Sequence, residues 1–430
     1  MEQLVIAKID EARQDLIDLC LRLGNQRDYG GHEIDVGRQV VQWLSDAGVE
    51  AWLQHLTDTS VNAVGLLRGL GGGKSLIFNA HMDTQGFAPA GGPDVERKRR
   101  GAWIEGDLLY GQGLANDKAQ LAAEMIAVRA IKSAGARLKG DLFVTGVAQE
   151  TSAPLFEGVS PEKRSGFGPR FGQIAEGAGA RWLVQHGVLA DFALVGEVSD
   201  FAVSIAQAGF LRVRVSVPGV VAYTPALFRG AKAGETPNPF ERAGYVIVAI
   251  ERWAREYEAE NTQSFAGGTF VPRAQVYEVS SSGPAWTEST DYCHVFVDIR
   301  LVPGADPVAV QDSLRRAVAA TGTACELRAF DFQRGFVAEN AEPLLAALRK
   351  AHRRVLDRDL PYANSTVHSM WRDANAFNEA GIPAIGYGPC TREVFGDFSG
   401  PRPIAVDDLV ATAKVFALTA LEVCGIAELK

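Results

Sequence analysis

A histidine and three acidic residues stand just after short apolar segments of the sequence, where side chains of these types could bind a metal ion or accept a proton. The segments and the polar residues after them are 76–78 with His81 and Asp83, 142–145 with Glu150 and Thr151, and 192–195 with Glu197. Such apolar runs are typical of strands buried on both faces of a parallel sheet. Because α/β sheets place their active sites at the carboxyl ends of the strands, we expect these side chains to share one crevice.

The spacing of His81 and Asp83 suits a metal ligand and the carboxylate that orients it. The aspartate could accept a hydrogen bond from the second ring nitrogen and so fix the tautomer. Taken alone, this pair is equally compatible with a structural role. A glycine-rich turn at 110–113 also delivers polar residues, Asn116 and Asp117, to the start of a helix. Four polar segments in this order favour a site over a coincidence.

The elements that must position these residues fall into two groups. In the first 200 residues, helical patterns at 1–24, 32–48 and 118–133 alternate with apolar strands. This alternation predicts an α/β fold with an open, mostly parallel sheet and helices on both faces. The first 207 residues therefore form the greater part of a catalytic domain.

From Leu211 onward, apolar and polar residues alternate with a period of two, as in a half-exposed strand. The order of elements becomes β-α-β-β-α-β, which is the split ferredoxin-like arrangement. A helix at 344–356, a strand at 382–387 and a closing helix at 406–424 then return to the first pattern. We therefore predict a catalytic domain of residues 1–207 and 334–430, with an α+β lid domain of residues 208–333 inserted into it.

Composition excludes several classes of protein. The 430 residues are 47% apolar and 22% charged, with a net charge of -9, which argues against a nucleic-acid-binding surface. No apolar run approaches the length that would cross a membrane, and the N-terminal segment reads as an amphipathic helix, not a signal peptide. The five cysteines form no CxxC pair, so we expect neither disulfides nor a thiolate metal site. A cytoplasmic location is the simplest expectation.

The order of these motifs resembles that of the peptidase M20 family of metallohydrolases. The resemblance covers most of the chain, including the inserted domain and the segment Gly381–Pro389. It implies that His81 and Glu197 bind a metal, that Asp83 orients the histidine, and that Glu150 is the general base. Because the family dimerises through its lid, the resemblance also implies a homodimer or a larger homo-oligomer.

Four positions depart from the family pattern. Asn116 stands where the family has a bridging aspartate, and Thr151 stands where it has a glutamate ligand of the second metal. The family's late metal-binding histidine is absent, and its expected position is near Phe398. Tyr223 stands where the family has a lid histidine. We therefore expect one divalent transition metal per subunit, held by His81, Asn116 and Glu197. Manganese, zinc, cobalt or iron would all suit a nitrogen and oxygen site. The alternative is that Asp117 faces the metal; otherwise it is an acid favoured at a helix N-terminus.

The remaining candidates concern the substrate, which we expect to be a small molecule with a carboxylate. Arg372 could clamp that carboxylate bidentately, or could form an ordinary salt bridge with a neighbouring acid. Tyr223 could donate its hydroxyl to a developing anion. His368, Thr151 and Phe398 are the other residues expected to line the substrate pocket.

The preserved residues are those of a hydrolase. A metal would lower the pKa of a bound water, and Glu150 would take its proton. The altered set resembles the branch of the family represented by 5-nitroanthranilate aminohydrolase, which implies replacement of the amine of an electron-poor aminobenzoate by hydroxyl, with release of ammonia. Two alternatives stay open: an amidohydrolase or peptidase that removes an N-acyl group or cleaves a dipeptide, and an inactive binding protein of the same fold. Retention of Glu150 together with the metal ligands argues against the inactive protein.

Overall fold

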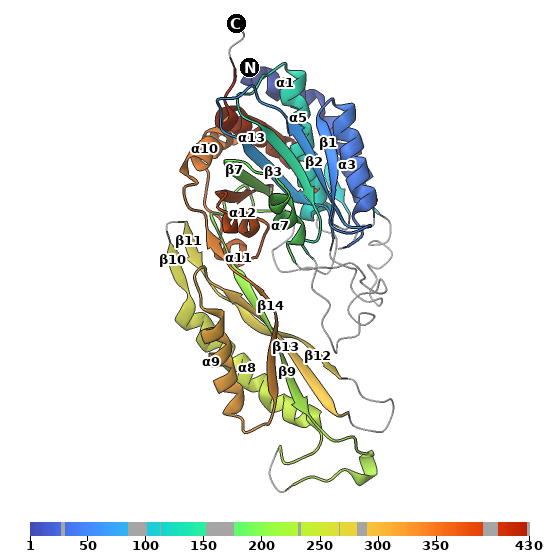
Figure 1. The fold of residues 1–430 in the computed structure, drawn as a ribbon, viewed down its shortest axis with the longest axis vertical. Coiled ribbons are helices and arrows are strands. Elements are labelled where there is room, and N and C mark those ends of the chain that lie inside the picture. Colours follow the sequence, from blue (N-terminus) through green and yellow to red (C-terminus); the bar gives the residue numbers. More distant parts are fainter. Residues whose placement is uncertain are drawn as a thin grey trace.

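The computed structural model describes residues 1–26, 31–84, 101–111, 113–151, 176–230, 234–265, 267–281, 290–389 and 403–427. It has two parts, each with its own sheet and its own buried apolar core (Figure 1). The larger part contains both chain ends, and the smaller part is built from the middle of the sequence. No helix of the described ranges is long and apolar enough to cross a membrane.

The larger part is organised around a six-stranded sheet in the order β1-β2-β6-β3-β7-β16. Strands β6, β3, β7 and β16 run parallel, whereas β1 and β2 are antiparallel to their neighbours. The three strands that precede the candidate site residues are buried along their whole length, which explains their apolar sequences. The predicted open, mostly parallel sheet is therefore confirmed. The strands are β1 (Glu50–His55), β2 (Val61–Leu67), β3 (Leu76–His81), β6 (Leu142–Val147), β7 (Phe192–Gly196) and β16 (Ala384–Tyr387).

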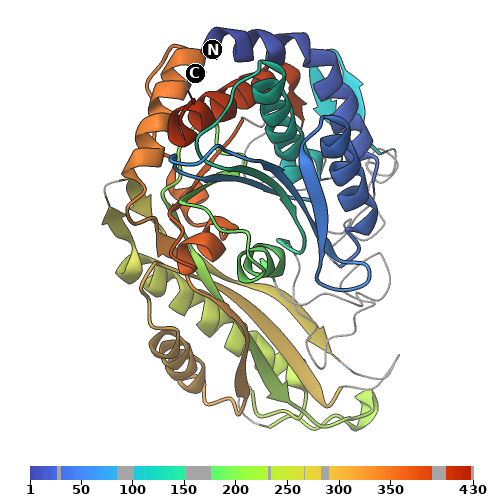
Figure 2. The ribbon, with the colours of Figure 1, turned by 45° about the horizontal axis from the view of Figure 1, so that its top comes forward.

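Helices cover both faces of this sheet, as Figure 2 shows. One face packs on the larger core, to which α1 (Glu2–Glu11), α2 (Arg13–Gly24), α3 (Ile34–Asp46), α5 (Ala119–Ser133), α10 (Glu342–Leu356) and α13 (Val406–Cys424) contribute. The other face packs on a smaller core with α7 (Ala178–Gln185) and α12 (Ala374–Glu379). The single helix expected over 1–24 is two helices, because the backbone leaves helical geometry at Ala12.

The smaller part is a four-stranded antiparallel sheet with two helices packed on one face. Its strand order, β12-β13-β9-β14, and its chain order, β-α-β-β-α-β, are those of the ferredoxin-like arrangement that the sequence predicted. Alternate residues of β9, such as Val213, Val215 and Val217, pack against the helices. The elements are β9 (Gly209–Pro218), α8 (Pro239–Asn261), β12 (Ala274–Ser281), β13 (Tyr292–Leu301), α9 (Pro307–Ala319) and β14 (Glu326–Gln333).

Short strands lie where the chain crosses between the two parts, and further short elements complete each part. Strand β8 (Ala206–Gln207), just before β9, pairs antiparallel with β15 (Phe336–Val337), just after β14, so the two chain crossings lie side by side. The domain limits at 207/208 and 333/334, which stay a prediction, fall at this paired crossing. The remaining elements are β4 (Trp103–Glu105), β5 (Leu108–Tyr110), η1 (Leu114–Lys118), η2 (Thr224–Ala226), β10 (Gln263–Phe265), β11 (Gly268–Phe270), α11 (Ser365–His368) and β17 (Ile404–Ala405).

Candidate metal centre

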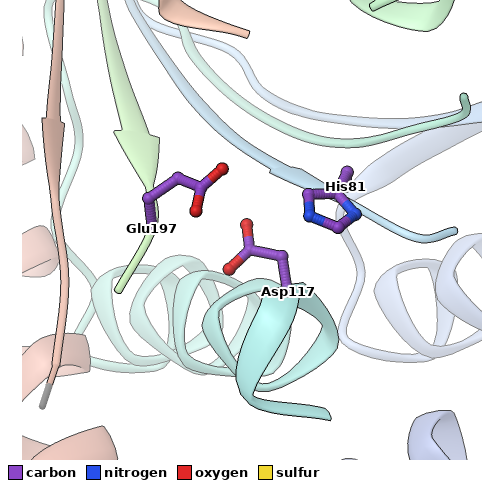
Figure 3. A group of neighbouring side chains, drawn as sticks. All are labelled: His81, Asp117 and Glu197. Atoms are coloured by element: carbon purple, nitrogen blue, oxygen red, sulfur yellow. The ribbon is translucent and has the colours of Figure 1, made fainter. Parts of the chain in front are cut away.

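Three buried side chains converge at the carboxyl edge of the six-stranded sheet (Figure 3). His81 ends β3, Asp117 lies in the π-helical turn η1, and Glu197 directly follows β7. One possible ligand atom of each lies within 4.8 Å of the others. We call His81, Asp117 and Glu197 the metal cluster, because their chemistry and their position fit a cation.

The metal cluster contains polar atoms that have no partner within the described chain. His81 Nε2 and both carboxylate oxygens of Asp117 are fully buried and accept or donate no hydrogen bond there. Leaving such a group buried and unpaired costs about 1–3 kcal/mol, so native proteins rarely do it without a reason. Imidazole nitrogen and carboxylate oxygen are suitable ligands for divalent transition metals. The residues present therefore fit a metal ion.

Asp83 orients His81 toward the metal cluster. The Nδ1 atom of His81 is 2.9 Å from the backbone carbonyl oxygen of Asp83 and 3.5 Å from its Oδ1, which leaves Nε2 for a cation. The Asp83 carboxylate is itself held by the backbone N–H groups of Glu150 and Thr151, each at 3.0 Å, and by the Thr151 hydroxyl at 2.6 Å. Burial alone would raise the pKa of Asp83, but its bonds to His81, Thr151 and Glu150 lower it. Asp83 is therefore a fixed anion behind the histidine.

Glu150 is placed as a proton acceptor beside the metal cluster. It follows β6, and its Oε2 lies 3.6 Å from His81 Nε2. Burial raises its pKa well above the ordinary value, and the nearby charge of Glu197 adds to this, although His81 opposes it. The preceding residue, Gln149, has a left-handed backbone with φ 57°, and its side-chain amide donates to Ser60 Oγ at 2.8 Å. The turn that carries Glu150 is thus anchored on both sides.

Buried acids around the cluster outnumber the cationic groups that could balance them. Burial raises the pKa values of Asp117 and Glu124 well above their ordinary range. Burial likewise raises the pKa of Asp373 to about 7 and that of Glu33 to about 8, with the charge of Asp83 contributing to both. This excess of negative charge favours the binding of a cation.

Of the two neighbours Asn116 and Asp117, it is Asp117, the alternative to the predicted ligand, whose carboxylate lies in the metal cluster. The backbone of Asn116 is non-helical, with φ -142° and ψ 84°, inside the turn η1. This local geometry directs the side chain of Asp117 toward His81 and Glu197, whereas Asn116 lines the adjoining cleft. The family-like spacing alone could not show which of the two neighbours faces the other ligands.

A cleft of about 610 Å³ opens beside the metal cluster, between the two parts of the molecule. Its catalytic wall includes Glu150, Thr151 and Glu197, and its opposite wall comes from the four-stranded sheet. Trp371, which is almost fully buried, and Arg372 also line it. The cleft is the place where a small substrate would meet Glu150.

The opposite wall carries a group of partly buried charges, which we call the arginine cluster: Arg212, Glu176, Asp298 and Asp331. Arg212 pairs with Glu176 at 2.5 Å, with Asp331 at 2.7 Å and with Asp298 at 3.5 Å. Arg300 donates from Nε to Asp298 at 3.0 Å, and its two terminal amino groups have no hydrogen-bond partner among the described residues. Sequence reasoning missed Arg212 and Arg300. The only available signal was a row of polar residues on one face of β9 and β13.

Arg372 lies in the interior, with only 3% of its surface exposed. Its Nη2 donates to the carbonyl oxygen of Val198 at 2.7 Å, and its Nε lies 3.7 Å from Glu197 Oε2. The structure therefore shows the salt bridge with a neighbouring acid, which was the alternative to the predicted clamp on a substrate carboxylate. Arg372 nevertheless lines the cleft, and its buried Nη1 has no hydrogen-bond partner among the described residues, so its predicted contact with a substrate carboxylate stays a prediction.

The other predicted pocket residues differ in their placement. Thr151 lines the cleft, but its hydroxyl donates to Asp83. His368 is fully buried with its ring edge against Phe265, and burial together with the charge of Arg372 lowers its pKa to about 4. Tyr223 is 55% exposed on the lid and does not line the cleft within one chain. Phe398 lies outside the described residues.

Comparison with known proteins gives consistent results. Residues 77–422 match the model of peptidase family M20/M25/M40. The chain is 22% identical over 445 residues to N-formyl-4-amino-5-aminomethyl-2-methylpyrimidine deformylase of Bacillus subtilis, an alignment that covers 95% of this chain and 94% of the relative.

Solved structures show the same fold at low sequence identity. The di-peptidase Dug1p of Saccharomyces cerevisiae has a TM-score of 0.69 at 13% identity, covering 99% of this chain and 98% of its own. The YXEP protein of Bacillus subtilis, described as a dinuclear metal-binding peptidase of the M20 family, has a TM-score of 0.62 at 15% identity, covering 96% of this chain and 99% of its own.

Proposed function

The chain belongs to peptidase family M20/M25/M40, and from this premise we propose that it is a hydrolase that uses a single divalent metal to replace the nitrogen substituent of a small molecule by hydroxyl. The observation that carries the proposal is the metal cluster with its unpaired buried ligand atoms, and Glu150 only 3.6 Å from His81. An inactive fold would have no reason to keep a buried base beside buried ligands that lack a partner.

His81, Asp117 and Glu197 would hold the metal, which supplies a Lewis acid and lowers the pKa of water in its reach. Glu150 accepts the proton of the attacking water at its carboxylate, since burial raises its pKa toward the operating range. The same group then donates that proton to the departing nitrogen. Asp83 keeps His81 in the tautomer that presents Nε2 to the cation.

A single metal is supported by the residues that occupy the ligand positions of a second metal. The Thr151 hydroxyl, at the position of a second-metal glutamate, is committed to Asp83 Oδ2 at 2.6 Å. The sequence contains no histidine after His368. The YXEP protein is a dinuclear metal-binding peptidase, so the number of metal ions bound per chain is a direct test.

Our first candidate reaction is displacement of the amine of an electron-poor aminobenzoate such as 5-nitroanthranilate. Water adds to the ring carbon, the carbon–nitrogen bond breaks, and nitrogen leaves as ammonia with the proton from Glu150. Hydroxide attack on such a ring delocalises its charge, so the second Lewis acid is not needed. Trp371 could stack on the ring, and the free amino groups of Arg300 could meet the carboxylate, in the place predicted for Arg372.

A second candidate is hydrolysis of an amide, in which Glu150 protonates the amine that leaves an acyl group. The similarity to a deformylase and to a di-peptidase favours this reaction class. Amide hydrolysis with one metal is chemically feasible. The same cleft and the same base serve both reactions, so the substrate must decide between them.

The deciding experiment combines metal analysis with two substrate panels. Protein purified without chelator should contain about one metal per chain. Release of ammonia from nitro-substituted 2-aminobenzoates would support the first candidate, and release of formate or amino acid from N-formyl and N-acyl compounds would support the second. Glu150→Gln, which should still bind metal, is the control for contaminating activity. Turnover unchanged in that variant would refute the proposal.

We also propose that the lid pairs two subunits. Its helix α8 exposes Phe240, Tyr245 and Val248, and β12 is an edge strand with an unpaired side in the described chain. An exposed apolar face beside an open strand edge is typical of an interface. Light scattering should give twice the chain mass, and Val248→Lys should shift it toward the monomer.

A further inference from the structure

Arg372 is a buried cation that stands next to a ligand of the metal cluster. Only 3% of its surface is exposed, and its Nε is 3.7 Å from Glu197 Oε2. Nη2 is held by the carbonyl oxygen of Val198 at 2.7 Å, while the buried Nη1 has no hydrogen-bond partner among the described residues. The guanidinium is thus held beside Glu197 by burial and by its bond to Val198.

This fixed charge acts on the metal cluster in two opposite ways. It stabilises the negative charge of Glu197 when no metal is present, because an arginine is always protonated in proteins. It also repels any cation that Glu197 would hold, and this repulsion is little screened in the interior. In the described chain it is the arginine that pairs with a member of the metal cluster.

We propose that Arg372 sets the metal affinity of this protein, weakening the site enough for the ion to exchange while keeping the metal-free fold stable. This inference rests on the metal site of the proposed function. It concerns a residue that touches a metal-cluster ligand but is not itself a ligand.

The opposite role would be that Arg372 holds Glu197 in the geometry that the metal requires. The two roles predict changes of opposite sign. If Arg372 repels the ion, a neutral side chain tightens binding. If Arg372 positions the ligand, a neutral side chain loosens it. Measurement of affinity therefore separates the two without any knowledge of the substrate.

The test is calorimetric titration of the chelator-stripped full chain with manganese and with zinc. Arg372→Gln keeps a donor for Val198 but removes the charge, and should bind the ion about tenfold tighter or more, from one charge repulsion at short range. Arg372→Lys keeps the charge and should stay within about threefold of the original protein. Unchanged or weaker binding by Arg372→Gln would overturn the proposal.

A matched control removes another arginine that pairs with a glutamate. Arg181 lies 3.0 Å from Glu379, and neither residue belongs to the metal cluster, so Arg181→Gln changes the net charge equally and should leave the metal affinity unchanged. If Arg372→Gln does not fold, Arg372→Met provides a neutral side chain of similar length. A tightening in Arg181→Gln equal to that in Arg372→Gln would also contradict the inference, because it would show an effect of net charge alone.

Melting temperatures give a second readout. Arg372→Gln should melt lower than the original protein without metal, and should recover more on adding metal. Failure of the original protein to bind either ion would refute the metal site itself, whereas normal binding with unresponsive variants would refute only the role of Arg372.

Discussion

Two groups of charged residues line the region of the cleft, and they differ in their burial and in their partners: the arginine cluster is partly buried and the metal cluster is buried. In the arginine cluster, Arg212 makes ion pairs with Glu176, Asp331 and Asp298, which give it a carboxylate on each side. In the metal cluster, Asp117 has two buried oxygens and His81 one buried nitrogen that make no hydrogen bond in the described chain, and Glu150 Oε2 lies 3.6 Å from that nitrogen. The charge of Arg212 is thus balanced by carboxylates of the described chain, although Asp298 Oδ1 itself makes no hydrogen bond. The described residues provide no hydrogen bond to the open atoms of His81 and Asp117.

The pKa values follow the same division. Burial would lower the pKa of the Arg212 guanidinium, but its three carboxylate partners raise it. Burial raises the pKa of Asp117, and the charge of Glu197 raises it further, opposed only by His81. Burial of charge is therefore not in itself the sign of a site. The sign of a site is a buried charged group that lacks a hydrogen bond, which a folded protein retains where a bound ligand stabilises that group.

The largest expected effect is a loss of turnover on changing Glu150, and it tests whether this residue is the general base. Glu150→Gln removes the proton acceptor while preserving shape, and should lower turnover about 100- to 10,000-fold, the usual contribution of a general base. Metal content measured alongside should not change, because Glu150 lies outside the metal cluster. Equal loss of metal and activity would place Glu150 among the ligands instead.

The next effect is a loss of stability on changing the arginine cluster. Arg212→Met removes the counter-charge that Glu176 and Asp331 share, whereas Asp298 keeps its ion pair with Arg300. The change should reduce the free energy of unfolding by about 3 kcal/mol, the low end for a broken buried ion pair. Urea denaturation of the metal-free protein measures this. Metal affinity should stay the same, and a large change in it would show that the two groups are coupled.

Changing Asp117 should weaken metal binding but raise the stability of the metal-free protein, the opposite of the result expected for Arg212→Met. Asp117→Asn should weaken metal binding at least about 100-fold, since even residues that only orient a ligand account for 10- to 100-fold. The same change removes a buried charge without a partner, and should stabilise the metal-free protein by about 1–3 kcal/mol. Asn116→Ala is the control, and should have the smaller effect on affinity. The reverse ranking would restore Asn116 as the ligand.

The pH dependence of stability gives a further distinction. Groups whose pKa is raised in the folded state, such as Asp117 and Asp373 (about 7), bind more protons folded than unfolded. The metal-free protein should therefore lose stability as pH rises from about 4 toward 8, by about 1 kcal/mol or more. Asp117→Asn should reduce this slope in thermal melts at several pH values. A slope that is identical in the variant would mean that Asp117 is not the titrating group.

The smallest effect is expected at Thr151. Thr151→Val removes the hydroxyl that donates to Asp83 but keeps the backbone N–H that donates to the same oxygen. We expect a loss of about 1 kcal/mol in stability and a modest loss of metal affinity. A large gain in bound metal would instead show that Thr151 blocks a second ion.

The sequence predicted the parts of the molecule that depend on local pattern. Apolar strands β3, β6 and β7 could be recognised because both faces are buried, and their ends placed His81, Glu150 and Glu197 correctly at one edge. The choice between Asn116 and Asp117 depends on the backbone torsions of one turn, which composition does not determine.

Contacts between distant parts of the chain were harder to predict. Arg372 meets Glu197 across 175 positions of sequence, and Arg212 meets Asp331 across 119. Each contact depends on how elements that are distant in sequence pack against each other within one part of the molecule. Residue type suggested that Arg372 would bind an acid, but only the fold identifies Glu197 as the neighbouring acid.

The position of α13 has a consequence for how the protein reaches its native state during synthesis. All three members of the metal cluster belong to the first 197 residues, yet the core beneath them includes α13, and Phe416 packs on Phe78 of β3 with ring centroids 4.9 Å apart. A nascent chain therefore carries the ligands long before it has the helix that buries their strands. Pairing over such long separations is slow and exposes apolar surface. The strand that carries His81 is therefore fully covered only after α13 has left the ribosome.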